Sequence, residues 1–290
     1  MRRNKGLMIS AIALVGAFAL TGCTDSGAST PSAAPVEEDV TFEAGTTMAA
    51  LNEAGEITIG TKFDQPLFGL KGPDGTPVGF DVEIGKLIAA KLGIEPSNIK
   101  WTETVSANRE PFIQNGQVDI VVATYTINDA RKEVVSFAGP YYEAGQDLLV
   151  LAGNEAKITG PEDLADKKVC TVSGSTSEKN IAAYTANIIA TDTYSNCLGP
   201  LRSGEVDAVT TDNVILAGLA DQNAGEFEVV GNPFTAEPYG IGLAKDDTEF
   251  RNFINDVLEE SYDDGTWAAA WEATAGSVLE TPEPPAVDRY

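Results

Sequence analysis

The sequence predicts an α/β protein whose 290 residues form two lobes, each with a largely parallel sheet flanked by helices. Strand patterns alternate with helix patterns along the chain, and one pattern occurs twice. Gly116-Gln-Val-Asp-Ile-Val-Val-Ala-Thr124 returns as Gly204-Glu-Val-Asp-Ala-Val-Thr-Thr-Asp212. Ligands of open α/β sheets bind beyond the carboxyl ends of the strands. If the two repeated strand ends face each other, they form a cleft between two lobes.

Composition excludes several classes of function. The formal net charge of −25 argues against a nucleic-acid partner, which requires basic patches. The sequence contains no histidine, which removes histidine-based catalytic triads and histidine metal sites. We therefore expect no metal, no cofactor and no catalytic residue.

The N-terminus predicts export. Residues 1–22 combine a basic start with a short apolar stretch, as in a signal peptide. They lead into Leu20-Thr21-Gly22-Cys23, which resembles the lipobox of bacterial lipoproteins and implies lipidation, by palmitate, of Cys23. The alternatives are an ordinary cleaved signal or an odd core cysteine. Residues 23–45 are rich in Ser, Thr, Ala, Pro and acid, and are expected to form a flexible tether.

Two cysteines remain after Cys23, namely Cys170 and Cys197. In an exported chain such a pair suggests a disulfide. The alternative is two buried free thiols.

Successive segments justify the α/β prediction. Strands are expected at residues 56–62, 77–80, 99–103, 119–123, 146–151, 168–172 and 239–244, because these runs are apolar or alternate. Helices are expected at 82–92, 108–114, 213–220, 248–264 and 267–271, and one starts at the capping-box pattern Ser175-Thr-Ser-Glu178. Asp212 is expected to cap the helix that follows it.

A family resemblance comes from Gly79-Phe-Asp-Val-Glu-Ile-Gly-Lys-Leu-Ile-Ala-Ala-Lys-Leu92. It resembles the signature of the extracellular solute-binding proteins of family 3, the polar amino-acid receptors of ABC importers. Bacterial glutamate- and aspartate-binding lipoproteins are the nearest members by motif. The resemblance implies a two-lobed, type II periplasmic-binding-protein-like fold, with mixed, mostly parallel sheets and two hinge strands.

This resemblance also implies the division of the chain. The first lobe would comprise residues 46–143 and 242–276, and the second lobe 146–241, with hinges near 143–146 and 238–242. Residues 277–290 are expected to form a loose tail. Cys170 and Cys197 lie where actinobacterial glutamate receptors are expected to carry a disulfide.

Eight ligand-binding residues follow from the resemblance. Arg131 would bind the ligand's α-carboxylate together with the Thr126 N–H group, while the Thr124 carbonyl and Asp212 would bind its ammonium group. Thr176 would add a contact from the second lobe. Lys62 and Arg109 would bind a distal carboxylate, and Phe80 would form an aromatic wall. The alternative to ligand binding is that these residues are surface cations, helix caps, strand-end hydroxyls or, for Phe80, part of the core.

These residues predict a monomeric, lipid-anchored, extracytoplasmic receptor, not an enzyme. It would deliver glutamate or aspartate to the permease and ATPase subunits of an importer. The alternatives are a receptor for a neutral polar amino acid such as glutamine or asparagine, a dehydratase or murein-cleaving enzyme on the same scaffold, and a sensory or adhesive lipoprotein.

Overall fold

The computed structural model describes residues 35–154 and 156–290. The predicted signal peptide, Cys23 and the first part of the tether lie outside the described residues. Within the described ranges, no helix combines the length and apolar character needed to cross a membrane.

The first lobe is built on a five-stranded sheet in the order β5-β1-β6-β13-β7. Strand β1 (Ile57–Thr61) pairs in parallel with β5 (Ile99–Glu103) and β6 (Ile120–Val121). Strand β13 (Glu237–Leu243) runs antiparallel between β6 and β7 (Ser136–Ala144). The first three strands therefore point their carboxyl ends to one edge, where a ligand site is expected.

The second lobe repeats this plan in the order β10-β9-β11-β8-β12. Strand β9 (Val169–Val172) pairs in parallel with β10 (Ile188–Thr191) and β11 (Ala208–Asp212). Strand β8 (Gln146–Leu151) runs antiparallel between β11 and β12 (Phe227–Val229). Both sheets are thus mixed, with as many antiparallel as parallel pairings. The antiparallel pairings are made by β8 and β13, the strands on which the chain enters the second lobe and returns to the first.

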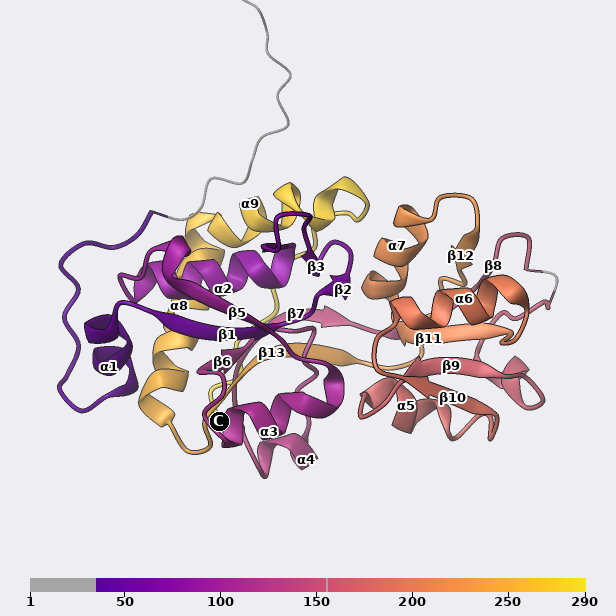
Figure 1. Ribbon diagram of the computed structural model, residues 1–290, viewed down its shortest axis with the longest axis horizontal. Helices are drawn as coiled ribbons and strands as arrows, with labels where there is room; N and C mark the ends of the chain where they lie inside the picture. The colour runs from indigo at the N-terminus through magenta and orange to yellow at the C-terminus, as the bar shows by residue number, and fades with distance from the viewer. Residues whose placement is uncertain (1–34, 155) are drawn as a thin grey trace, which may run out of the picture. The chain divides into compact units, whose positions relative to one another are not determined.

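Helices cover both faces of each sheet (Figure 1). Those of the first lobe are α1 (Thr47–Ala54), α2 (Phe80–Lys91), α3 (Arg109–Gln114), α4 (Asp129–Lys132), α8 (Thr248–Asp264) and α9 (Thr266–Ala273). Those of the second lobe are α5 (Thr176–Ile181), α6 (Ser195–Ser203) and α7 (Asn213–Gln222). Short 3₁₀ turns occupy Pro96–Asn98, Ser106–Asn108, Pro161–Leu164 and Ala275–Ser277, and a small sheet joins β2 (Asp64–Gln65), β3 (Gly69–Lys71) and β4 (Pro77–Val78).

Alternation along the strands divides the core between the two faces of the sheets. Ile120 and Val122 face one cluster, in which α2, α8 and α9 pack, whereas Val121 and Ala123 face a second cluster under α3. All four side chains are buried, which explains the unbroken apolar run in the sequence.

Strand β6 is shorter than the predicted 119–123. The chain turns soon after it at Thr124, which takes a left-handed φ of 45° and whose N–H donates to Asp81 at 2.8 Å instead of to a neighbouring strand. This turn is the first structural feature that shapes the site.

The chain passes to the second sheet at Gly145, between β7 and β8. On its return, β13 is already paired with β7 from Glu237 onward, which places this part of the expected hinge inside the first sheet.

The last residues differ from the expected loose tail. Tyr290 Oη accepts a hydrogen bond from the Phe137 N–H at 2.9 Å, and the Asp288 N–H donates to the Gly139 carbonyl at 2.9 Å. Lys132 Nζ and the Arg251 guanidinium lie over the Tyr290 ring, at 3.9 and 4.3 Å from its centroid. The tail therefore covers the edge strand β7, whose backbone groups would otherwise lack partners.

Candidate functional site

Asp81 holds the turn that carries Thr124. Its carboxylate accepts the Thr124 N–H at 2.8 Å and the Tyr141 hydroxyl at 2.6 Å. Asp81 lies in the first turn of α2, which begins after Gly79, where a Cβ would lie 2.4 Å from the Phe68 backbone. Burial raises the pKa of Asp81 to about 7, although both hydrogen bonds oppose the rise.

Arg131 lies in α4, where Asn128 caps the helix by accepting the Arg131 N–H at 3.0 Å. Its Nη1 donates to the Thr126 carbonyl at 2.6 Å and its Nε to Glu110 Oε1 at 3.1 Å. Its Nη2 reaches the second lobe, at the Gly174 carbonyl, over 3.5 Å. Burial lowers the pKa of Arg131 to about 10, so the guanidinium stays charged at neutral pH.

Arg109 begins α3 and is buried to 3% exposure. Its Nη1 donates to the Ala123 carbonyl at 3.1 Å and, more weakly, to the Thr124 carbonyl at 3.4 Å. Its guanidinium stacks over the Tyr125 ring at 4.2 Å, and Arg131 lies over the same ring at 4.9 Å. The Arg109 Nε has no partner among the described residues. One aromatic ring thus supports two cations.

Lys62, directly after β1, is as buried as Arg109. Its Nζ donates to Ser106 Oγ at 3.1 Å. Burial, reinforced by the charge of Arg109, lowers the pKa of Lys62 to about 7. The two cations predicted to define the side-chain subsite therefore lie together and inside the protein.

The second lobe contributes the start of α5. Ser175 Oγ accepts the Glu178 N–H at 2.9 Å, as the capping box predicts, but Glu178 Oε2 accepts from the Gly174 N–H instead of from the cap residue. Thr176 Oγ1 lies 3.5 Å from Thr126 Oγ1 of the first lobe. The hydroxyls of the two predicted ligand residues therefore face each other.

Asp212 ends β11 and lies at the N-cap position of α7, but its side chain makes no capping bond. The prediction of a capping carboxylate was wrong, because Asp212 Oδ2 accepts the Tyr239 hydroxyl at 2.6 Å. Its other oxygen, Oδ1, is buried and has no partner in the described part of the chain. Burial and the nearby Glu237 charge raise the pKa of Asp212 to about 7. An ammonium group would satisfy both the free oxygen and the charge.

A small polar cavity joins these groups. Its lining residues are Ser106, Arg109, Thr124, Thr126, Ser175, Thr176, Ser177, Tyr194, Asp212 and Ile215. Five predicted residues are among them, while Lys62 and Arg131 touch the lining through Ser106 and Thr126. The space is about 10 Å³, enough for about one water molecule.

Phe80 is not among these residues. It is fully buried in the core, with its ring 5.5 Å from Trp267 and 5.1 Å from Trp271. The aromatic wall expected at this position is instead part of an aromatic cluster behind the sheet, since α2 turns the Phe80 side chain toward α9.

Sequence reasoning missed Tyr125 and Tyr194. Tyr125 lies between the predicted Thr124 and Thr126, and an aromatic residue flanked by two strand-end hydroxyls was an available signal. Tyr194 precedes α6 in a stretch without a recognisable motif, so nothing in the sequence indicated it.

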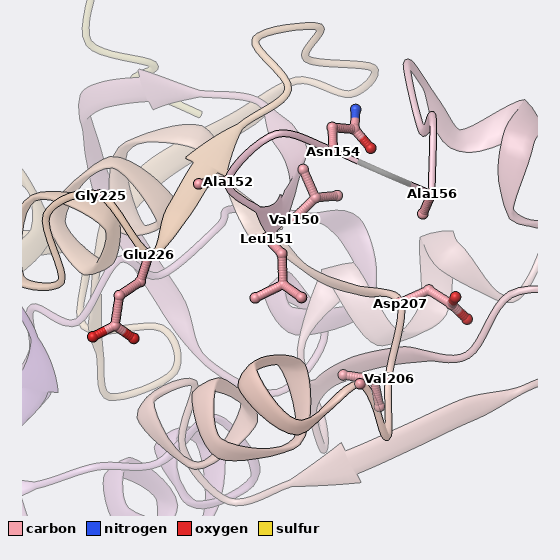
Figure 2. A pocket seen from close by; sticks show the side chains of 10 residues that line it. Val150, Leu151, Ala152, Asn154, Ala156, Val206, Asp207, Gly225 and Glu226 are labelled. Atoms are coloured by element: carbon pink, nitrogen blue, oxygen red, sulfur yellow. The ribbon is translucent and has the colours of Figure 1, made fainter.

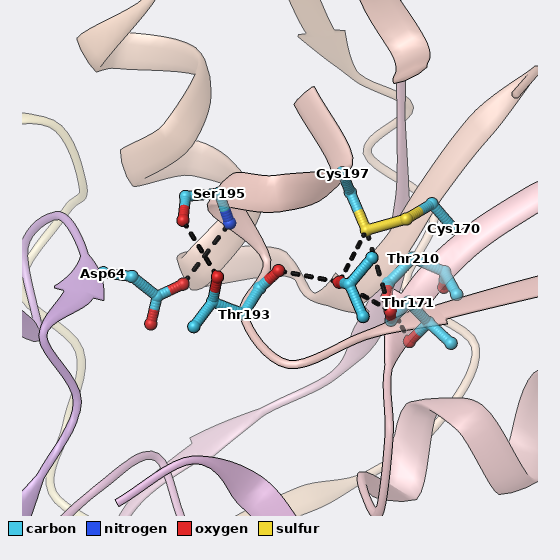
Figure 3. The surroundings of a disulfide bond; sticks show 8 residues. Asp64, Cys170, Thr171, Thr193, Ser195, Cys197 and Thr210 are labelled. Carbon is cyan, nitrogen blue, oxygen red and sulfur yellow. Dashed lines mark hydrogen bonds between the residues drawn. A yellow bond between two sulfur atoms is a disulfide. The ribbon is translucent and has the colours of Figure 1, made fainter. Parts of the chain in front are cut away.

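The predicted disulfide is confirmed. Cys170 of β9 is bonded to Cys197 of α6 (Figure 3). It lies on the face of the second sheet that α6 and α7 cover, beside the strand that ends at Asp212.

A larger cavity of about 490 Å³ lies elsewhere in the second lobe (Figure 2). It is lined by the end of β8 and by the loops before β11 and β12. Its carboxylates already have partners: Asp207 accepts the Lys168 N–H at 2.8 Å, and Glu226 pairs with Arg202 at 2.6 Å. It therefore offers no uncompensated charge to an amino acid.

Comparison with known proteins agrees with this fold. Residues 57–273 match the model of the bacterial extracellular solute-binding proteins, family 3. The chain is 41% identical to the glutamate-binding protein GluB of Corynebacterium efficiens over 267 residues, 88% of this chain and 85% of that protein. It is 38% identical to the glutamine-binding protein GlnH of Bacillus subtilis over 266 residues, 89% of this chain and 94% of that protein.

Solved structures give the same picture. An ancestral arginine-binding protein bound to glutamine matches with a TM-score of 0.69 and 38% identity, over 75% of this chain and 96% of that one. A two-lobed binding protein is the class that fold and site define. The chain belongs to the bacterial extracellular solute-binding proteins, family 3, and is an amino-acid-binding protein of ABC importers.

Proposed function

We propose that this chain captures glutamate and delivers it to the membrane subunits of an ABC importer. The observation that carries the proposal is the pair Lys62 and Arg109, two cations each buried to 3% exposure beside the cavity. Neither forms an ion pair with a carboxylate of the described residues, although burying an unpaired charge is costly. A second, distal carboxylate on the ligand would remove that cost.

The other predicted residues form a clamp for the amino-acid backbone. Arg131 presents a planar guanidinium suited to the α-carboxylate, and its hydrogen bond to the Thr126 carbonyl supports a shared grip with Thr126, whose N–H is the second donor we assign. Asp212 offers the ammonium group its Oδ1, which has no partner in the part of the chain that the structure describes. Because these two residues lie in different lobes, ligand binding favours the closed arrangement.

The size of the cavity supports this coupling. A space of about 10 Å³ holds about one water molecule, so glutamate needs an arrangement in which the groups that line the cavity stand further apart than they do here. After closure, the bound charges are surrounded by protein, which strengthens their interactions.

Glutamine is a second candidate ligand, supported by the low pKa of Lys62. With a pKa of about 7, the amine is in part neutral at neutral pH and can then accept a hydrogen bond from an amide. The similarity to GlnH of Bacillus subtilis points the same way. The importer partners and the lipid anchor at Cys23 belong to this proposal as well.

Calorimetric titration of the purified, refolded protein with the twenty amino acids tests the proposal. Glutamate is expected to bind more tightly than aspartate and glutamine, and to be recovered unchanged after denaturation. Tighter binding of glutamine would replace the proposed ligand with the second candidate. Recovery of a converted product would indicate an enzyme instead.

A further inference from the structure

Residues 64–67 of the first lobe, here called the latch segment, contact two helices of the second lobe. At one end, Asp64 Oδ2 accepts the Ser195 N–H at 3.3 Å (Figure 3). At the other, the Pro66 carbonyl approaches α7 so closely that a Cβ on Gly218 would lie 2.5 Å from its oxygen. Neither contact involves the residues assigned to the ligand.

The contact at α6 has a fixed base. Ser195 is the first residue of α6, and its N–H lies at the positive end of the helix dipole, which favours a carboxylate such as Asp64. Cys197, two residues later, is bonded to Cys170 in the central part of the second sheet. Thr191 Oγ1 also donates to the Thr193 carbonyl at 2.8 Å, which fixes the approach to the helix. Asp64 therefore meets a part of the second lobe that is covalently tied to its sheet.

The contact at α7 depends on glycine. Gly218 is buried in the helix interior, where alanine would be the better helix former. The Pro66 oxygen and the Leu67 Cγ, which is 3.2 Å from the same Cβ position, leave no room for a side chain. The close approach of the other lobe thus gives a physical reason for a glycine that the helix itself does not need.

The latch segment is also held firmly in its own lobe. The Leu67 carbonyl accepts the Phe80 N–H at 2.8 Å, and Leu67 keeps an unfavourable left-handed φ of 72°. Between the two contacts, Gln65 Oε1 accepts the Thr124 hydroxyl at 3.0 Å. The segment therefore connects the strand end that lines the ligand cavity to both helices of the opposite lobe.

We propose that the latch segment holds the lobes closed through Ser195 and Gly218, and thereby sets the rate at which bound amino acid dissociates. The inference rests on ligand capture between two lobes and not on which amino acid is captured. Ligand enters while the contacts are broken and is retained while they are made, so their loss acts on dissociation more than on association.

The first test compares Gly218→Ala with Gly199→Ala. Both glycines lie inside second-lobe helices, but a Cβ on Gly199 meets nothing within 4 Å among the described residues beyond its chain neighbours. Gly199→Ala controls for a methyl group added to a helix before a proline, and only Gly218→Ala disturbs the latch segment. By stopped-flow measurement, Gly218→Ala is expected to release glutamate about tenfold faster, and Gly199→Ala at the unaltered rate. Equal release rates for the two variants would overturn the proposal.

The second test compares two cysteine pairs, and that comparison can be made with or without bound amino acid. The double variant Asp64→Cys/Ser195→Cys is expected to form a disulfide under mild oxidation, and faster with bound amino acid than without. Asp64→Cys/Ser203→Cys is the control, because the far end of α6 lies about 12 Å further along the helix. If the unaltered protein bound no amino acid, the proposed function would fail. The disulfide yields of the two pairs would still test whether the latch segment contacts the start of α6. Equal yields in both pairs would refute it.

Discussion

At the scale of single residues, the site combines charges that the folded protein holds at a cost. Lys62 loses basicity and Asp81 and Asp212 lose acidity, in each case mainly because burial disfavours the charged form. Such perturbed groups cluster where a ligand is bound, since the ligand supplies the missing countercharges. Within the described ranges, the Arg109 Nε and the Asp212 Oδ1 have no hydrogen-bond partner, which indicates the same incomplete pairing.

Arg109 and Arg131 are expected to differ in which ligands they affect. Arg109→Met keeps the side-chain stem on Tyr125 but removes the charge proposed to meet the distal carboxylate. It should weaken glutamate binding by about 2–5 kcal/mol, at least about 30-fold, and glutamine binding far less. Arg131→Met should weaken both, because both ligands share the α-carboxylate. Calorimetry with both ligands on both variants measures this, and equal losses in Arg109→Met would refute the assignment.

The sequence indicated which residues lie near the cavity better than it indicated the contacts that their side chains make. Lys62, Arg109, Thr124, Thr126, Thr176 and Asp212 are brought together because the strand ends that carry them, or that adjoin them, face one cavity. Phe80 was misplaced, because the signature fixes a helix start but not the side to which its aromatic ring turns. The hydrogen bond of Asp212 to Tyr239 could not be predicted either, since it joins β11 to a strand from the other sheet.

At the scale of elements, short polar bonds decide where strands and helices end. Sequence periodicity placed β6 correctly but extended it, and the turn at Thr124 that follows could not be predicted, because its contact with Asp81 joins residues 43 positions apart. At helix starts the local signals succeeded in part: Ser175 caps α5 as predicted, whereas the cap predicted at Asp212 is absent. The hydrogen bonds between elements, such as those of Asp81 with Thr124 and of Asp212 with Tyr239, have no local signal in the sequence.

The Cys170–Cys197 bond is expected to stabilise the second lobe. It closes a loop with a sequence separation of 27, which corresponds to about 3–4 kcal/mol on the chain-entropy model. Cys170→Ser/Cys197→Ser should therefore unfold at a lower urea concentration than the unaltered oxidised protein. Adding reductant should lower the midpoint of the unaltered protein and leave that of the double variant unchanged. Coinciding midpoints before any reductant would show that the bond contributes nothing.

At the scale of the whole molecule, the repeated strand pattern was the most informative feature of the sequence. It indicated two similar sheets before any element was known, and both sheets follow the same strand plan. The antiparallel strands were harder to predict, because β13 returns to the first sheet about a hundred residues after β6. The position of the tail could not be predicted at all. It depends on contacts of the Tyr290 ring with Lys132 and Arg251, two cations that lie far apart in the sequence.

Buried charges also make the stability of the ligand-free protein depend on pH. The raised pKa values of Asp81 and Asp212, about 7 in place of 3.8, contribute stability that is full below about pH 4 and lost as pH rises through 7. The lowered pKa of Lys62, about 7 in place of 10.5, contributes stability that is full above about pH 10 and lost as pH falls through 7. These three groups therefore lower the free energy of unfolding of the ligand-free protein most near neutral pH.

The thermal midpoint of the ligand-free protein is expected to rise when pH is lowered from 7 to 5, as measured by calorimetric scans. Asp212→Asn should reduce this rise, because only the Asp81 carboxyl is left to protonate in this range, whereas the exposed Asp166→Asn should keep it in full. Saturating glutamate should raise the midpoint most near pH 7, where it supplies the countercharges that the empty site lacks. An Asp212→Asn profile as steep as that of Asp166→Asn would show that Asp212 titrates as an ordinary surface acid, and the proposed ammonium contact would lose its support.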